Sequence, residues 1–243
     1  MTYCVGLATS QGLVFMSDTR TNAGIDNIST FKKMYTWEEP GERAVVLMTA
    51  GNLATTQAVV SLLDERTKAP GDRIPSILEA PSMYQVAKMV GDTLREIISD
   101  HAETGQKADA SFNASIIVGG QIKGSEPRLF LIYPEGNFVE SGKDTPFFQI
   151  GETKYGKPII VRAFDESMNF EDAIKLLLVS FDSTIKANLS VGQPIDFQIY
   201  ERDSFRLGKS GRIEKGDAYF AEISDKWGDE LRNAFAALPD FKF

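Results

Sequence analysis

The first twenty residues show the alternation expected of two strands joined by a tight turn. Apolar side chains alternate with small or polar ones over residues 3–7, and an apolar run resumes at residues 13–16 after Gln11 and Gly12. Such a pattern predicts a β-hairpin. It begins directly behind Met1, where chains are usually disordered unless something holds them. The pattern therefore indicates a chain start that is fixed for a reason.

The rest of the chain alternates between strand-like and helix-like periods. The expected strands cover residues 43–48, 111–121, 128–133, 138–139, 147–150 and 195–200. The expected helices cover residues 52–68, 82–100, 154–164, 170–186 and 219–238. Asn52 and Ser82 stand where N-caps are expected, and Pro158 is compatible with a helix only in its first turn.

This order of elements predicts an α+β fold. Strands occur in runs and helices occur in runs, which favours antiparallel sheets with separate helical layers over a parallel doubly wound sheet. Two facing sheets with a helix pair outside each would use every element, so we expect a four-layer α/β/β/α sandwich. Residues 1–243 contain no linker, repeat or low-complexity tract, and we expect a single domain.

Composition narrows the classes of function. The 243 residues carry a formal net charge of −8, which argues against nucleic-acid binding, where a basic face supplies most of the affinity. The chain has one cysteine, Cys4, and one histidine, His101. We therefore expect no internal disulfide and no metal site built from several cysteines or histidines, and a Ser-His-Asp triad is unlikely. We expect no cofactor and no metal. Without a leader or an apolar run of about 18 residues, a cytoplasmic protein without membrane contact is expected.

Thr2 is a candidate nucleophile. A threonine hydroxyl needs an adjacent base, and an α-amine titrates near pH ~8, close to a working pH. If Met1 is trimmed, the amine of Thr2 itself would supply that base. Met-Thr starts are common, however, and the pair by itself is weak support for catalysis.

Three further features add to that support. Asp18 ends the second expected strand, and either Lys32 or Lys33 could point inward and favour an alkoxide. Residues 49–52 form a strand-to-helix junction, whose free backbone N–H groups suit an oxyanion hole. Taken singly, a lysine pair is usually solvated and an aspartate behind a strand is usually a turn residue.

Together these segments resemble proteasome β-type subunits. The resemblance rests on TYCVGLATSQGLVFMSDTR, FKKMY and LMTAG in the N-terminal half and on IDFQIYERD near residue 200. More narrowly, the length, the segment SFDSTIKANLSVGQPID and the long C-terminal helix are similar to the bacterial proteasome-like family called Anbu, the ancestral β-subunit. The resemblance implies the N-terminal-nucleophile hydrolase fold, which is a four-layer sandwich.

The resemblance also implies roles for particular residues. Thr2 would be the nucleophile, Asp18 would orient the catalytic lysine, Lys33 rather than Lys32 would be that lysine, and the N–H of Gly51 would bind the oxyanion. By position, four residues are expected to flank the substrate cleft: Thr21, Asn22, Thr49 and Leu53.

Two positions depart from the proteasome pattern. Glu152 stands where the family has a small serine loop, and Asn188 stands where it has an aspartate. A carboxylate beside the amine would raise the amine's pKa and make it a poorer base at neutral pH. We therefore expect Glu152 and Asn188 to modulate any activity, unless Glu152 points to solvent or to a subunit contact.

Two functions of different class remain open at this point. The first is a threonine-type peptidase or amidohydrolase acting on a peptide or a small amide, and the second is a proteasome-like scaffold with a vestigial site. Another N-terminal-nucleophile amidase, such as an acylase, is a weaker third. The resemblance implies self-association into a homo-oligomeric ring or spiral, and it leaves an ATPase partner open.

Overall fold

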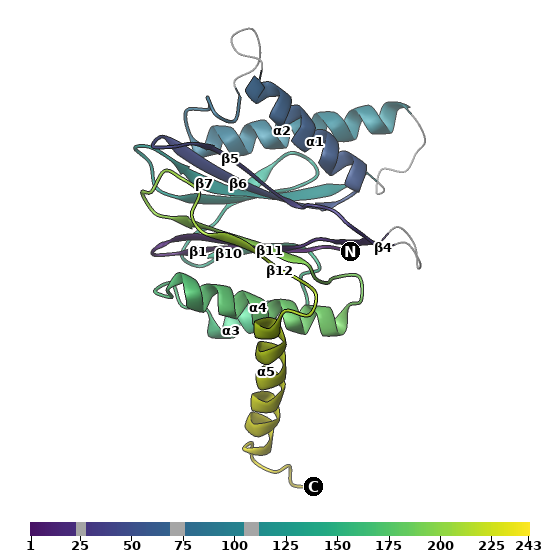
Figure 1. Ribbon diagram of the computed structural model, residues 1–243. Coiled ribbons are helices and arrows are strands. Elements are labelled where there is room, and N and C mark those ends of the chain that lie inside the picture. The colour runs from purple at the N-terminus through teal and green to yellow at the C-terminus, as the bar shows by residue number, and fades with distance from the viewer. Residues whose placement is uncertain (23–27, 69–75, 105–111) are drawn as a thin grey trace.

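The computed structural model describes residues 1–22, 28–68, 76–104 and 112–243. Within these stretches two five-stranded antiparallel sheets face each other, and helices cover both outer sides (Figure 1). The four-layer α/β/β/α sandwich expected from the order of elements is confirmed. None of the helices in these stretches combines the length and apolarity that crossing a bilayer requires.

The first sheet carries the chain start and has the strand order β10-β1-β2-β11-β12. Its strands are β1 (Tyr3–Thr9), β2 (Gly12–Asp18), β10 (Phe147–Gly151), β11 (Ile195–Glu201) and β12 (Ser210–Ile213). β1 and β2 form the predicted hairpin, and β1 also pairs with β10 so that Tyr3 lies opposite Gly151. The chain start, Asp18 and Gly151 consequently lie at one end of this sheet.

The second sheet has the order β5-β6-β7-β8-β9, and a small β3-β4 pair follows β2. The strands are β3 (Arg20–Asn22), β4 (Ile28–Thr30), β5 (Met34–Glu39), β6 (Arg43–Gly51), β7 (Ala114–Ile122), β8 (Arg128–Ile132) and β9 (Phe138–Glu140). β6 ends at Gly51, which pairs with Ala114 of β7.

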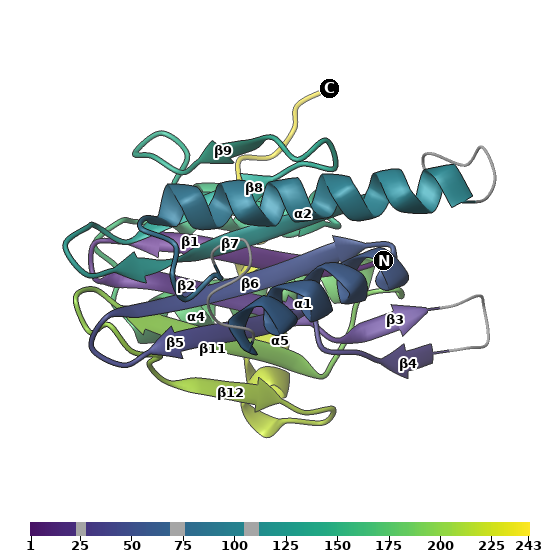
Figure 2. The ribbon, with the colours of Figure 1, turned by 90° about the horizontal axis from the view of Figure 1, so that it is seen from above.

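The helices form the two outer layers and one projection. They are α1 (Leu53–Lys68), α2 (Met83–Thr104), α3 (Lys157–Ala163), α4 (Phe170–Ala187) and α5 (Ala218–Ala236). Seen from above, α1 and α2 run across the second sheet (Figure 2). α3 and α4 cover the first sheet, and α5 leaves that layer and points away from the sandwich (Figure 1).

Three buried apolar clusters hold the layers together. One lies between α1, α2 and the second sheet, one between the two sheets, and one between the first sheet and α3–α5. Neighbouring residues of a central strand serve different clusters: Val14 packs toward α4, whereas Phe15 packs between the sheets. This two-sided burial explains why residues 13–16 read as an unbroken apolar run.

Sequence patterning missed or misplaced a few elements. β5 and β12 were not expected; both are edge strands with polar, half-exposed positions, which weakens the alternation. α3 begins at Lys157 rather than at residue 154, which places Pro158 in its first turn as required. The strand expected from residue 111 begins at Ala114, and Ser111 lies outside the described residues.

Candidate active site

A buried ion pair joins the two sheets at the end where the chain starts. Asp18 ends β2 and Lys33 immediately precedes β5, and their side chains are 0% and 5% exposed. Lys33 Nζ donates to Asp18 Oδ1 at 2.8 Å and to the carbonyl of Arg20 at 2.5 Å. The backbone N–H of Tyr3 donates to the same Oδ1 at 3.0 Å. One carboxylate oxygen thus connects the first strand to the lysine.

The electrostatics of this pair are set by burial. Burial raises the pKa of Asp18, while the Lys33 ammonium and the N–H groups of Tyr3 and Gly192 act against that increase. Lys32 is exposed, and its ammonium lies 5.4 Å from the centre of the Tyr35 ring. Of the two candidate lysines, Lys33 is therefore the one that points inward.

A cavity of about 340 Å³ opens above Lys33. Residues from the chain start, β3, the segment before β5, β6, α1 and β10 contribute to its wall. They are Met1, Thr2, Thr21, Lys33, Thr49, Ala50, Gly51, Leu53, Thr56 and Gly151. A hydroxyl, an ammonium and a strand-to-helix junction thus face one space, which is the set of groups that acyl transfer requires.

The backbone of Gly51 lies very close to the backbone of residues 113 and 114. Its φ of +119° is unfavourable for residues with a side chain, and a Cβ would lie 2.4 Å from the carbonyl oxygen of Asn113. The N–H of Thr49 points toward β5 and donates to the carbonyl of Lys33. The N–H of Asn52 points to the opposite side, toward β7, and donates to the carbonyl of Asn113. Because N–H groups alternate along a strand, we expect the Gly51 N–H to point past the start of β5, toward Lys33.

The segment after β10 holds the chain start in place. The N–H of Glu152 donates to the carbonyl of Thr2 at 2.6 Å. Gly151 has a φ of +82°, and a Cβ on it would lie 2.0 Å from that same carbonyl oxygen. Only glycine allows Thr2 to approach the segment this closely.

Glu152 is buried and does not point to solvent. Its side chain accepts hydrogen bonds from Asn188 Nδ2 at 3.0 Å and from the N–H of Lys154 at 3.1 Å, and the residue is 7% exposed. Asn188 Nδ2 also lies 4.0 Å from the sulfur of Met1. The two residues singled out as departures in the sequence therefore contact each other beside the chain start.

The amine of Met1 experiences four influences in this environment. Burial and the Lys33 charge lower its pKa, and Asp18 and Glu152 raise it, so that the pKa lies below its ordinary value. Glu152 acts in the expected direction, but it is the smallest of the four contributions. The net shift is opposite to the one that Glu152 alone would produce, because burial of the ammonium and the Lys33 charge outweigh the two carboxylates.

Most of the residues predicted for the site come together. Thr2, Thr21, Lys33, Thr49, Gly51 and Leu53 line the cavity, and Asp18 lies behind Lys33. The side chain of Asn22, in β3, lies outside the described part of the structure. Sequence reasoning included Ala50 in the junction at residues 49–52 but missed the lining residues Thr56 and Gly151. Thr56 could have been found, because it follows Leu53 by three positions and so shares its helix face.

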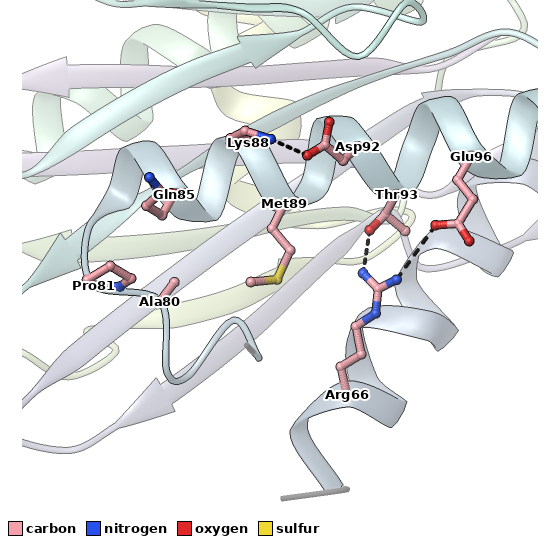
Figure 3. A pocket seen from close by; sticks show the side chains of 9 residues that line it. All are labelled: Arg66, Ala80, Pro81, Gln85, Lys88, Met89, Asp92, Thr93 and Glu96. Carbon is pink, nitrogen blue, oxygen red and sulfur yellow. Dashed lines mark hydrogen bonds and ion pairs between the residues drawn. The ribbon is translucent and has the colours of Figure 1, made fainter. Parts of the chain in front are cut away.

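A second cavity, of about 240 Å³, lies between α1 and α2 on the outer surface (Figure 3). Arg66 donates to Thr93 Oγ1 at 2.7 Å and faces Glu96 at 3.7 Å, while Lys88 pairs with Asp92 (Figure 3). Its charged groups are paired with one another, and the hydroxyl of Thr93 is bound to Arg66. We therefore assign the candidate chemistry to the Thr2 cavity.

Comparisons with known proteins identify the family of this chain. The model of the family described as proteasome subunit matches residues 2–199. The chain is 25% identical over 213 residues to proteasome subunit beta 2 of Nitrosopumilus maritimus, covering 85% of this chain and 89% of that protein.

Solved structures of Anbu proteins superpose over the whole chain. The Gly-1 mutant of Anbu from Hyphomicrobium sp. strain MC1 has a TM-score of 0.93 and 51% identity, with full coverage of both chains. A structure described as the helical assembly of the Anbu complex from Pseudomonas aeruginosa has a TM-score of 0.92 and 46% identity, covering 99% of this chain and 98% of that one.

The close approach of Gly151 to the Thr2 carbonyl predicts that a side chain at position 151 destabilises the fold. Gly151→Ala should lower the free energy of unfolding by about 2 kcal/mol or more, because a Cβ cannot coexist with the Thr2 carbonyl. Chemical denaturation measures this change. Gly142→Ala is the matched control, since nothing lies within 4 Å of its Cβ, and it should change stability by less than about 0.5 kcal/mol. Equal effects of the two variants would contradict the role given to Gly151.

Proposed function

The chain belongs to the proteasome subunit family, and we propose that it is a threonine N-terminal-nucleophile hydrolase that cleaves an amide bond in a peptide or a small amide. The observation that carries the proposal is the buried Asp18–Lys33 pair facing a cavity that also contains Thr2 and Gly51. Burying a lysine charge is costly, and a catalytic role accounts for a lysine that lines the cavity with Thr2 as well as pairing with Asp18.

In the proposed mechanism, removal of Met1 exposes the α-amine of Thr2. This amine accepts the proton of Thr2 Oγ1 while that oxygen attacks the substrate carbonyl carbon. The Lys33 ammonium, held by Asp18 Oδ1, stabilises the negative charge on Oγ1, and the Gly51 N–H stabilises the oxyanion. The amine then donates its proton to the leaving nitrogen as the C–N bond breaks. Water, deprotonated by the same amine, attacks the resulting ester and releases Thr2.

The surroundings of the amine support its role as the base. A site that lowers the pKa of the amine at this end of β1 increases the fraction of free base near neutral pH. We extend this reasoning from the Met1 amine to that of Thr2, because Lys33, Asp18 and Glu152 border both. Self-association, in a ring or a spiral, is part of the proposal because a similar Anbu protein forms a helical assembly.

One observation favours the second candidate, a scaffold with a vestigial site. The side chains of Glu152, which is buried, and Asn188, which is half-buried, are hydrogen-bonded beside the chain start, and Met1 itself lines the cavity. If Met1 remained in place, it would occupy the space of the substrate and leave Thr2 without its base. The fate of Met1 therefore separates the two candidates.

The fate of Met1 can be measured directly. We expect the intact mass of the purified protein to lack one methionine, and a β-lactone probe to add once, at Thr2. Thr2→Ala should lose the adduct, whereas Thr21→Ala, which alters another hydroxyl of the same cavity, should keep it. A retained methionine and an unreactive Thr2 would favour the scaffold.

The lysine pair supplies an internal control. Lys33→Ala should reduce the rate of labelling at Thr2 at least about 100-fold, because the developing charge on Oγ1 loses its counter-charge. Lys32→Ala should leave the rate within about twofold, because Lys32 is exposed. Circular dichroism establishes that each variant is folded. A larger effect from Lys32→Ala than from Lys33→Ala would show that the catalytic role belongs to Lys32.

Glu152 gives a prediction with a defined sign. Glu152→Gln removes a negative charge that stabilises the ammonium, so the pKa of the amine should fall and the acidic limb of the pH–rate profile should move to lower pH. The measurement is the labelling rate between pH 5.5 and 9. Glu166→Gln, at an exposed position, is the control. An unchanged profile in Glu152→Gln would rule out the charge effect.

A further inference from the structure

One wall of the candidate site is formed where β6 faces α1. Along β6, Leu47 packs with the helices and Met48 packs between the sheets, so Thr49 again faces the helical side. Leu53 and Thr56 of α1 line the same cavity as Thr49. Thr49 and Thr56 are only 3% and 4% exposed. The inner wall of the cavity thus carries two nearly buried threonines.

The hydroxyls of these two threonines differ in their partners. Thr56 Oγ1 donates to the carbonyl of Leu53 at 3.0 Å, a hydrogen bond within its own helix. Thr49 Oγ1 has no hydrogen-bond partner among the described residues, and it is not sealed from solvent. A ligand that fills the cavity removes the water from this hydroxyl. The hydroxyl then stays unpaired, at a cost in binding, unless the ligand itself supplies a partner.

The charges at the cavity argue against an ionised partner. Among the described residues that line the cavity, Lys33 alone has an ionisable side chain, so a cationic ligand group would meet repulsion and no carboxylate. Lys33 Nζ donates to Asp18 Oδ1 and to the carbonyl of Arg20, and in the proposed mechanism its third N–H serves Thr2 Oγ1. A carboxylate on the ligand would compete with Thr2 for that N–H.

We propose that Thr49 Oγ1 binds the side chain of the residue whose carbonyl carbon Thr2 attacks, and that the site selects an uncharged side chain that forms hydrogen bonds, such as the carboxamide of glutamine. This inference rests on the proposed function and names the substrate class of the same site. The hydroxyl donates to a carboxamide oxygen or accepts from a carboxamide nitrogen, so either orientation of the amide satisfies it. An apolar side chain of the same length would leave the hydroxyl buried and unpaired.

The test compares blocked tripeptide amides of aminomethylcoumarin that differ only in the residue before the scissile bond. Glutamine, glutamate, norleucine and lysine at that place have similar lengths but offer a hydrogen-bonding, an anionic, an apolar and a cationic side chain. With wild type, kcat/KM for the glutamine substrate should exceed that for the norleucine substrate at least about fivefold, as expected for one hydrogen bond left unmade. The two charged substrates should also be cleaved more slowly than the glutamine substrate.

Two substitutions at position 49 separate the hydroxyl from the rest of the side chain. Thr49→Val keeps the shape and removes the hydroxyl, so the glutamine-to-norleucine ratio of kcat/KM should fall at least about fivefold. Thr49→Ser keeps the hydroxyl and should keep the ratio. A merely structural defect would lower both rates together and leave the ratio unchanged.

Thr67→Val is the matched control on α1. The hydroxyl of Thr67 donates to the carbonyl of Asp64 at 2.7 Å, and Thr67 does not line the cavity. Its loss should leave kcat/KM for both substrates within about twofold of wild type. Circular dichroism establishes that each variant is folded.

Several outcomes would overturn the inference and leave the hydrolase standing. An equal ratio in Thr49→Val and wild type would remove the role of the hydroxyl. Faster cleavage of the norleucine, lysine or glutamate substrate would refute the substrate class, as would β-lactone labelling of Thr2 without cleavage of any of the four amides. Absence of both labelling and cleavage would refute the hydrolase and this inference with it, so the two failures are distinguishable.

Discussion

Asp18 and Lys33 bring opposite charges into the interior where the two sheets meet, and the candidate site is arranged around them. Removing two charges from water costs several kcal/mol per ion, and only close pairing with further hydrogen bonds offsets that cost. Here the pair gains the N–H of Tyr3 and the carbonyl of Arg20. These bonds tie the start of β1, the end of β2, the start of β3 and the residue before β5 to one point. The position of Thr2 follows from that tie.

The backbone imposes a second constraint on the same end of the sheet. Gly51 and Gly151 both adopt a positive φ, and both approach another backbone segment more closely than a side chain would permit. The first shapes the junction between β6 and α1, and the second lets β10 approach the carbonyl of Thr2. Hydroxyl, ammonium and backbone N–H can share one cavity because these two positions lack a Cβ.

The contact between Glu152 and Asn188 bears on both candidate functions. A carboxylate beside the amine works against the free base, whereas burial and Lys33 work in its favour and outweigh it. The geometry is thus compatible with an active base once Met1 is gone.

Local patterns in the sequence were sufficient for most of the elements, their order and the four-layer arrangement, because the period of apolar residues depends on near neighbours. They were insufficient for the edge strands β5 and β12, whose polar positions blur that period. The sequence also pointed to Thr2, Asp18 and Gly51, but by spacing alone it left Lys32 and Lys33 equivalent. Tertiary structure separated them, since only Lys33 reaches Asp18, fifteen positions away. It also added Thr56 and Gly151 to the cavity, and it showed that burial and Lys33 hold the pKa of the Met1 amine below its ordinary value. Burial and the distances between charges depend on residues far apart in the chain, and these meet only when the two sheets pack.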